Sequence, residues 1–346
     1  MKLLIGVLGV AVGVAYLGEY GFNIPIMAFL PSAAALVILS MIIGEATEQL
    51  STHIGQRMAG LINVTLSNLA ELIIIYTAIS ANEIELAKAG IAGSIVGNLL
   101  LVKGSSIIVG CLRHKTLSFD PNVATLYINQ LFLVGSTLFL PTMFSTSIPV
   151  HLHGKLSGWL AAMLFGAYVF YIFISRRDER YQPVHEQSKS VVHHWHPAVS
   201  VAVLIGSTAV AFHMSHIMVA HVEHFAQTTG WSKSFIGFML LPIIGNLAEH
   251  LPAVRWARRK MVELSLSISV GSASQVGMVV VPFAVLFGFL TGHPFTLDFS
   301  GLPLHLIVLS FVGTFLVLRD NQWSLSEGIM LVALYIAMMI SFGFTQ

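Results

Sequence analysis

The tetrapeptide Asn-Leu-Ala-Glu occurs twice in the chain, at residues 68–71 and at residues 246–249. The two copies lie 178 positions apart (246 minus 68), and further identities fall at the same shift. These identities are Glu85-Leu86 with Glu263-Leu264, Gly93-Ser94 with Gly271-Ser272, and Glu45 with Glu223. Chance can supply one such match between apolar segments, but several matches in one register indicate an internal repeat.

Both copies lie in a sequence that is too apolar for a water-soluble protein. Hydrophobic residues make up 55% of the 346 residues, and charged residues make up only 10%, against about 25% in an ordinary soluble domain. Several stretches of roughly 20 residues carry almost no charge, which is the length that crosses a bilayer. The sequence therefore predicts an integral membrane protein whose surroundings are lipid. The net charge of +1 indicates no nucleic-acid partner, and the single cysteine, Cys111, excludes an intrachain disulfide.

We predict an all-α polytopic membrane protein with about eleven transmembrane helices. The predicted spans are 2–18, 25–47, 59–80, 87–111, 122–141, 155–175, 198–222, 233–255, 263–290, 302–318 and 324–343. The first span, within residues 1–20, is expected to be retained because no clear small-residue cleavage site follows it. The other ten spans form two five-helix repeats, residues 25–175 and 198–346, joined by a polar, histidine-containing linker at residues 176–197.

The distribution of lysine and arginine predicts how these spans are oriented. Thirteen of these residues fall on one side of the predicted membrane, and only Lys88, Lys155 and Lys233 fall on the other. Lys103 lies inside the fourth span and is left out of this count. Positive charge gathers on the cytoplasmic side, so we expect the N-terminus and the linker to be cytoplasmic and the C-terminus to be outside. Because each repeat has five spans, the second enters the membrane from the opposite side, as in many secondary transporters.

The two glutamates of the repeated motif are the first candidates for function. Glu71 and Glu249 fall well inside the third and eighth spans, where a carboxylate is costly and usually marks an ion or proton path. Asn68 and Asn246 precede them by three positions, hence on nearly the same helix face. Carboxylate and amide oxygens suit calcium rather than zinc or copper. The alternative is a buried, protonated glutamate that only joins helices, which two symmetric copies make less attractive.

Further neutral oxygen donors occur at similar depth in the fourth and ninth spans. Ser94 and Asn98 lie in the fourth span, and Ser272 and Gln275 lie in the ninth. Polar residues at such positions serve either as cation ligands or in helix–helix packing, and the sequence leaves both possibilities open. Lys103 either extends its ammonium toward the cytoplasmic face, which we expect, or acts as a fixed buried cation.

A second group of residues is placed to carry protons to and from the spans. Possible proton-access residues are Glu45 and Glu48 near the end of span two, and His216 and Glu223 in and after span seven. Simple solvation explains them equally well. Histidines also lie in the linker, where they can sense pH or bind a metal, although an exposed histidine usually does neither.

The sequence resembles the calcium/proton exchanger family of the calcium/cation antiporter superfamily over nearly its whole length. The resemblance is carried by residues 235–250 (FIGFMLLPIIGNLAEH), by residues 60–72 around the first motif copy, and by residues 93–100. It implies that Glu71 and Glu249 bind calcium alternately with protons, with Asn98 and Gln275 as polar neighbours. The chain departs from the family pattern at Ser67, where glycine is usual, at His216, and at Lys103.

These observations predict a secondary cation/proton antiporter rather than an enzyme. The substrates would be calcium and protons, with calcium efflux coupled to proton influx across a bacterial or archaeal plasma membrane, and no cofactor is expected. A sodium or potassium/proton antiporter on the same scaffold is the main alternative. A non-transporting membrane sensor and an intramembrane hydrolase are less attractive, because the intramembrane acids are divided between symmetric halves.

Overall fold

The computed structural model describes residues 2–22, 24–53, 66–175, 195–299 and 301–345. The chain divides into two compact units. The first unit comprises residues 1–90 and 188–248 with the last residue, and the second comprises residues 91–187 and 249–345. Most of the predicted linker, including His185, His193 and His194, falls outside the described residues. Helices α5 and α11 each begin in the first unit and end in the second.

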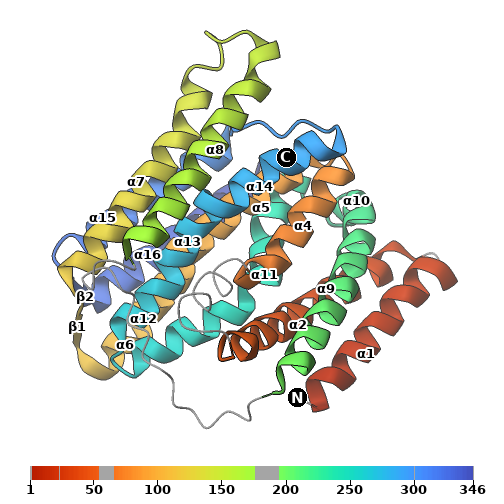
Figure 1. Ribbon diagram of the computed structural model, residues 1–346, viewed down its shortest axis with the longest axis horizontal. Helices are drawn as coiled ribbons and strands as arrows, with labels where there is room; N and C mark the ends of the chain where they lie inside the picture. The colour runs from red at the N-terminus through yellow and green to blue at the C-terminus, as the bar shows by residue number, and fades with distance from the viewer. Residues whose placement is uncertain (1, 23, 54–65, 176–194, 300, 346) are drawn as a thin grey trace. The chain divides into compact units, whose positions relative to one another are not determined.

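The first unit is entirely helical in its described part. Its elements are α1 (Lys2–Tyr16), the π-helical turn η1 (Leu17–Gly21), α2 (Pro25–Ser51), α4 (Leu69–Ser80), the start of α5 (Ile84–Val96), α9 (Pro197–Ala220), α10 (Val222–Thr229) and the start of α11 (Lys233–Arg258). Helices α1 and α9 both pack against α2, and α9 also packs against α4 (Figure 1). Pro25 and Pro197 begin their helices, since the first helical residue needs no N–H for an internal bond.

The second unit contains the remaining helices and one short strand pair. In chain order its elements are the end of α5, η2 (Gly97–Val102), α6 (Lys103–His114), β1 (Thr116–Ser118), α7 (Pro121–Met143), α8 (Val150–Ser175), the end of α11, α12 (Val262–Leu266), η4 (Ser267–Gly271), α13 (Ser272–Gln275), η5 (Val276–Val280), α14 (Val281–Thr291), α15 (Leu302–Leu318), β2 (Gln322–Ser324) and α16 (Leu325–Gly343). Helix α6 packs against α16, and α7 packs against α15.

The strand pair adds one feature to the predicted all-helical fold. Strands β1 and β2 pair antiparallel, with Leu117 opposite Trp323, and both of these side chains are fully buried. The pair follows α6 and precedes α16, so it ties together the ends of two helices that pack on each other. Three-residue strands carry too little alternation to be recognised in an apolar sequence.

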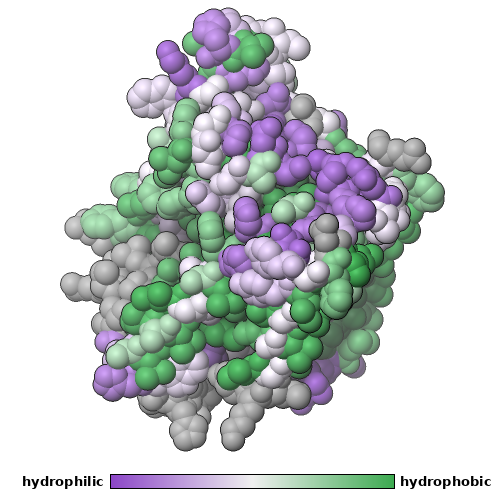
Figure 2. Space-filling model, turned by 90° about the vertical axis from the view of Figure 1, so that its right-hand side faces the viewer, coloured by the Kyte–Doolittle hydropathy of each residue, from purple (hydrophilic) through white to green (hydrophobic). Residues whose placement is uncertain are grey.

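The described helices confirm a polytopic membrane protein. Eight helices are long and apolar enough to cross a bilayer, and a ninth span results when the two parts of α11, Lys233–Leu247 and Glu249–Arg258, are joined across their break. Two shorter apolar helices, Leu69–Ser80 and Leu302–Leu318, complete the set in the described part of the chain. Large hydrophobic side chains are exposed on many of these helices, including Phe132, Trp159 and Leu290. Figure 2 shows a wide area of hydrophobic residues on one face of the molecule, as a lipid-facing surface requires.

Candidate functional site

The first motif copy lies at the start of α4, in the first unit. Asn68 directly precedes the helix, and Glu71 occupies its first turn, where a carboxylate complements the positive end of the helix dipole. Both side chains are buried, with 0% and 5% of their surface exposed. The amide Nδ2 of Asn68 donates to the hydroxyl of Ser67 at 3.4 Å. Ser67, the residue that departs from the family pattern, is thus a polar neighbour of the motif.

The glycine that precedes the second motif copy packs against this glutamate within the same unit. A Cβ placed on Gly245 would lie 3.5 Å from the Cβ of Glu71 and 3.6 Å from its Cα, which is ordinary van der Waals distance. The backbone of α11 therefore passes directly beside Glu71. Asn246, the next residue, is also buried, at 1% exposure. The first unit thus holds Asn68, Glu71 and Asn246 on two helices that are in contact.

Glu249 lies in the second unit, where it belongs to a chain of hydrogen bonds. The hydroxyl of Ser272 donates to Oε2 of Glu249 at 2.8 Å. The amide Nδ2 of Asn98 in turn donates to the hydroxyl oxygen of Ser272 at 3.3 Å. Asn98 is almost fully buried, and its Oδ1 atom has no hydrogen-bond partner within the part of the chain that the structure describes. An amide oxygen and a carboxylate are therefore held within one short network, both of them hard donors of the kind that calcium prefers.

Irregular helix surrounds the polar residues of the second unit. Asn98 lies inside the π-helical segment η2, η4 ends directly before Ser272, and η5 starts directly after Gln275. Segments of π-helix occur frequently at functional sites. At the repeat shift of 178, residues 97–102 correspond to residues 275–280, where η5 occupies 276–280. The internal repeat therefore extends from the sequence to the positions of the irregular turns.

The remaining predicted site residues are placed as follows. Ser94 is buried on α5, and Gln275 is half-buried at the end of α13. Glu45 is half-buried on α2, where its Oε1 accepts a hydrogen bond from Gln49 at 3.0 Å. The side chains of Glu48, His216 and Glu223 are exposed. The structure does not test whether any of these side chains carries protons or cations, so those roles stay predictions.

The expectation that Lys103 extends toward the membrane surface is wrong. Its side chain is fully buried at the start of α6, and its Nζ donates to the backbone carbonyl of Thr314 on α15 at 3.3 Å. The small residue Gly104 brings α6 close to α16, since a Cβ there would lie 3.1 Å from the carbonyl oxygen of Gly328. The ammonium of Lys103 therefore ends at a backbone carbonyl inside the second unit and not at the membrane surface.

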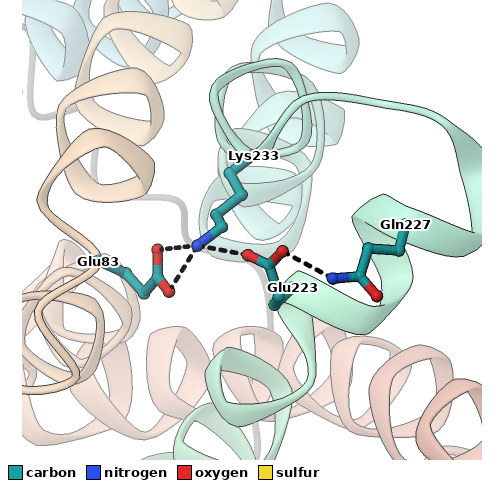
Figure 3. A network of polar contacts seen from close by, with 4 residues as sticks. All are labelled: Glu83, Glu223, Gln227 and Lys233. Carbon is teal, nitrogen blue, oxygen red and sulfur yellow. Dashed lines mark hydrogen bonds and ion pairs between the residues drawn. The ribbon is translucent and has the colours of Figure 1, made fainter.

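Sequence reasoning missed a network of charged residues in the first unit. The ammonium of Lys233 contacts both carboxylate oxygens of Glu83, at 2.9 and 3.0 Å, and Oε2 of Glu223 at 2.6 Å (Figure 3). Gln227 donates a further hydrogen bond to Glu223 at 2.9 Å. Hydrogen bonds from Lys233, and then from Gln227, lower the pKa of the exposed Glu223 carboxylate. Glu83 and Lys233 are 150 residues apart in the chain, so no local pattern could have indicated their pairing.

The side chains near the two glutamates are mostly oxygen donors. No group of three or more histidine, cysteine, aspartate or glutamate side chains is close enough to hold a metal ion among the residues that the structure describes. The polar atoms around the two glutamates are instead amide and hydroxyl oxygens. Such a donor set fits a hard cation that is carried as substrate.

Comparison with known proteins supports this interpretation. The family model described as "Sodium/calcium exchanger protein" matches residues 24–176 and 199–344. A Ca(2+)/H(+) antiporter of Aphanothece halophytica is 30% identical over 96% of this chain and 94% of its own length. A Ca(2+)/H(+) antiporter of Synechocystis is 31% identical over 91% of this chain and 90% of its own length.

Solved structures show the same fold. The structure of native YfkE superimposes with a TM-score of 0.85 at 26% identity, covering 98% of this chain and 99% of that protein. The H+/Ca2+ exchanger CAX superimposes with a TM-score of 0.78 over 98% of this chain and 88% of its own, at 16% identity. The matched segments cover most of the chain in two blocks, each containing one copy of the motif. The chain therefore belongs to the sodium/calcium exchanger protein family, a family of transporters rather than enzymes.

Proposed function

We propose that this protein is a calcium/proton antiporter in which Glu71 and Glu249 bind calcium and protons in turn. The observation that carries the proposal is the pair of identical Asn-x-x-Glu motifs in apolar helices of a chain whose relatives are named Ca(2+)/H(+) antiporters. Asn68, Asn246, Asn98 and Gln275 would contribute amide oxygens, and Ser94 and Ser272 would contribute hydroxyl oxygens.

The chemistry of a carboxylate in an apolar helix supports exchange of this kind. Burial disfavours the charged form of a carboxylate, whereas a nearby cation favours it, so protons and a metal ion compete for the same oxygens. Two glutamates together carry two negative charges, which equals the charge of one calcium ion. Protonated glutamates carry none, which permits the carrier to return without buried charge.

The predicted topology gives the proposal a direction. We infer eleven spans from the eight long helices, α11 and the two shorter apolar helices. With the N-terminus cytoplasmic and the C-terminus outside, the repeats at residues 25–175 and 198–346 enter the membrane from opposite sides. The proton gradient of a typical bacterium points inward, so the expected net reaction is calcium efflux driven by proton influx. His216, Glu45, Glu48 and Glu223 remain candidates for proton access.

The test is transport in liposomes of defined composition. The purified protein is reconstituted, a pH gradient is imposed, and calcium flux is followed beside sodium and potassium controls. We expect calcium flux that depends on the gradient and is lost in Glu71→Gln and in Glu249→Gln. Calcium flux that persists in either variant would contradict the assigned site. Flux of monovalent ions alone would show that calcium is not the substrate and would favour the sodium or potassium/proton antiporter.

A further inference from the structure

Lys233 is the first residue of α11, the helix that carries the second motif. Its ammonium contacts Glu83, which lies in the turn between α4 and α5, and Glu223, which lies in the first turn of α10 (Figure 3). Helix α4 carries Glu71 and ends at Ser80, three residues before Glu83. One lysine therefore links the start of one motif-bearing helix to the end of the other, within a single unit.

A line of close contacts runs from this lysine along α11 to Glu71. The residues of the line are spaced by four positions, so they share one face of the helix. They are Lys233, Gly237, Leu241 and Gly245. Lys233 meets Glu83, a Cβ on Gly237 would lie 2.7 Å from the carbonyl of Leu86, and Leu241 contacts Gly90. Gly245 then meets Glu71 itself.

The contacts along this line differ in whether they fix the distance between the helices or the position of α11 along its axis. Gly237 and Gly90 have no side chains, so the helices approach closely, as small residues permit in membrane proteins. Such smooth surfaces hold the distance between helices but fix the position along the helix axis weakly. The two-oxygen contact between Lys233 and Glu83 is directional, with N–O distances of 2.9 and 3.0 Å. Of these contacts, the ion pair is therefore the one suited to fix how far α11 extends past α4.

We propose that Lys233 is a positioning residue that sets the axial position of α11 and thereby places Gly245, and with it the next residue Asn246, relative to Glu71. The inference rests on the proposed function, because the affinity for calcium is the quantity that this position controls. Loss of the ion pair lets the first part of α11 move along α4 and α5. Gly245 and the amide oxygen of Asn246 are then displaced relative to Glu71, and calcium binds more weakly.

Glu83 and Glu223 are expected to contribute unequally. Glu83 binds the ammonium with both oxygens, and its side chain is 23% exposed. Glu223 is 53% exposed and lies on α10, which carries no motif residue. An exposed ion pair contributes little, so we expect the Glu83 contact to hold the ammonium and the Glu223 contact to add little to it.

The experiment compares three variants with the wild type in the liposome assay. Lys233→Met keeps the length of the side chain and removes its charge, and we expect the KM for calcium to rise by about fivefold with kcat little changed. Lys233→Arg should restore most of the affinity. The control is Lys155→Met, which removes an exposed lysine from α8 (Val150–Ser175) and should leave the KM near that of the wild type.

A charge exchange separates positioning from loss of folding. Lys233→Glu combined with Glu83→Lys, made in the Glu223→Gln background to avoid a repulsive pair, should return the KM toward the wild-type value. Binding is measured independently as the rise in Tm that calcium causes in detergent, which follows the affinity. An unchanged KM in Lys233→Met would overturn the positioning role. So would a charge-exchanged protein that is folded but whose KM for calcium stays raised. Absence of calcium flux in the wild type would instead overturn the proposed function, so the two failures are distinguishable.

Discussion

The two copies of the Asn-Leu-Ala-Glu motif have the same sequence and occupy different places in their helices. Glu71 lies in the first turn of a twelve-residue helix, against the backbone of Gly245. Glu249 lies within the 26-residue helix α11, directly after the break that follows Leu247, and accepts a hydrogen bond from Ser272. The backbone of Gly245 lies against the Cα and Cβ of Glu71, and the hydroxyl that donates to Glu249 accepts a hydrogen bond from Asn98 in turn.

The difference shows what an internal repeat does and does not preserve. It preserves the motif and even the positions of the π-helical segments η2 and η5. It does not preserve the place of each glutamate within its helix, which is the first turn of α4 for Glu71 and the interior of α11 for Glu249. Identical residues can therefore respond differently to substitution, and the predictions below use that difference.

The largest effect is expected from neutralising either glutamate. Glu71→Gln and Glu249→Gln should each reduce calcium flux to the background of empty liposomes, because an amide can neither balance the charge of calcium nor exchange a proton at neutral pH. Both proteins should still fold, since glutamine has nearly the same shape as glutamate. A matched control is Gln227→Glu on α10, which adds an exposed acid and should leave flux intact. Retained flux in only one of the two variants would show that the copies are functionally unequal.

The hydrogen bond from Ser272 provides the second prediction. Ser272→Ala removes the donor to Glu249 and the acceptor for Asn98. Loss of a partner that orients a ligand typically costs about 10-fold in metal affinity, so the KM for calcium should rise by about that factor. Ser272→Thr retains the hydroxyl and should behave more like the wild type. If alanine and threonine give the same KM, the hydroxyl does not orient Glu249.

Two glycines of α11 provide the third prediction. A methyl group at Gly245 would meet Glu71 at ordinary contact distance, whereas one at Gly237 would lie 2.7 Å from a backbone oxygen that cannot move aside easily. We therefore expect Gly237→Ala to destabilise the protein by about 1–3 kcal/mol and to raise the KM for calcium. Gly245→Ala should have the smaller effect on stability, although it is nearer the motif. Thermal unfolding of both variants measures the difference, and a larger loss in Gly245→Ala would contradict the packing described for the first unit.

Much of the fold was predictable from the sequence, because lipid imposes strong rules on length and polarity. The predicted spans 302–318 and 324–343 agree with α15 and α16 to within one residue. Charge-free length and flanking turns suffice to place such helices. The strands β1 and β2 and the breaks into π-helix could not be predicted, since each depends on contacts between distant parts of the chain.

The candidate site was predictable as a set of residues and not as an arrangement. An acidic residue inside an apolar helix usually marks an ion or proton path, which identified Glu71 and Glu249 as candidates. The internal repeat supported the assignment of both residues. Nothing in the local sequence indicated that Ser272 donates to Glu249 or that Lys103 ends at the carbonyl of Thr314. Lys103 was wrongly expected at the surface because its length permits it, whereas close packing of α6 with α16 prevents it. The hydrogen-bond partner of a side chain is set by tertiary packing, and a single sequence does not reveal that packing.

The smallest effect that we predict concerns Glu223, in the unit that contains the first motif copy. Hydrogen bonds from Lys233 and Gln227 lower the pKa of its carboxylate in the folded protein. A group whose folded pKa is lowered stabilises the fold above its unfolded pKa, and that stabilisation disappears as the pH falls through the folded value. Between about pH 6 and about pH 3, wild-type Tm should therefore fall slightly more than the Tm of Glu223→Gln.

Salt provides the control for this difference. Glu223 is half-exposed, so the ion pair with Lys233 is screened in about 1 M salt, and the two proteins should then respond to acid alike. If acid lowers the Tm of the wild type and of Glu223→Gln by the same amount at low salt, Glu223 does not stabilise the first turn of α11, which carries Lys233. The position of α11 beside the first motif copy would then depend on Glu83 alone.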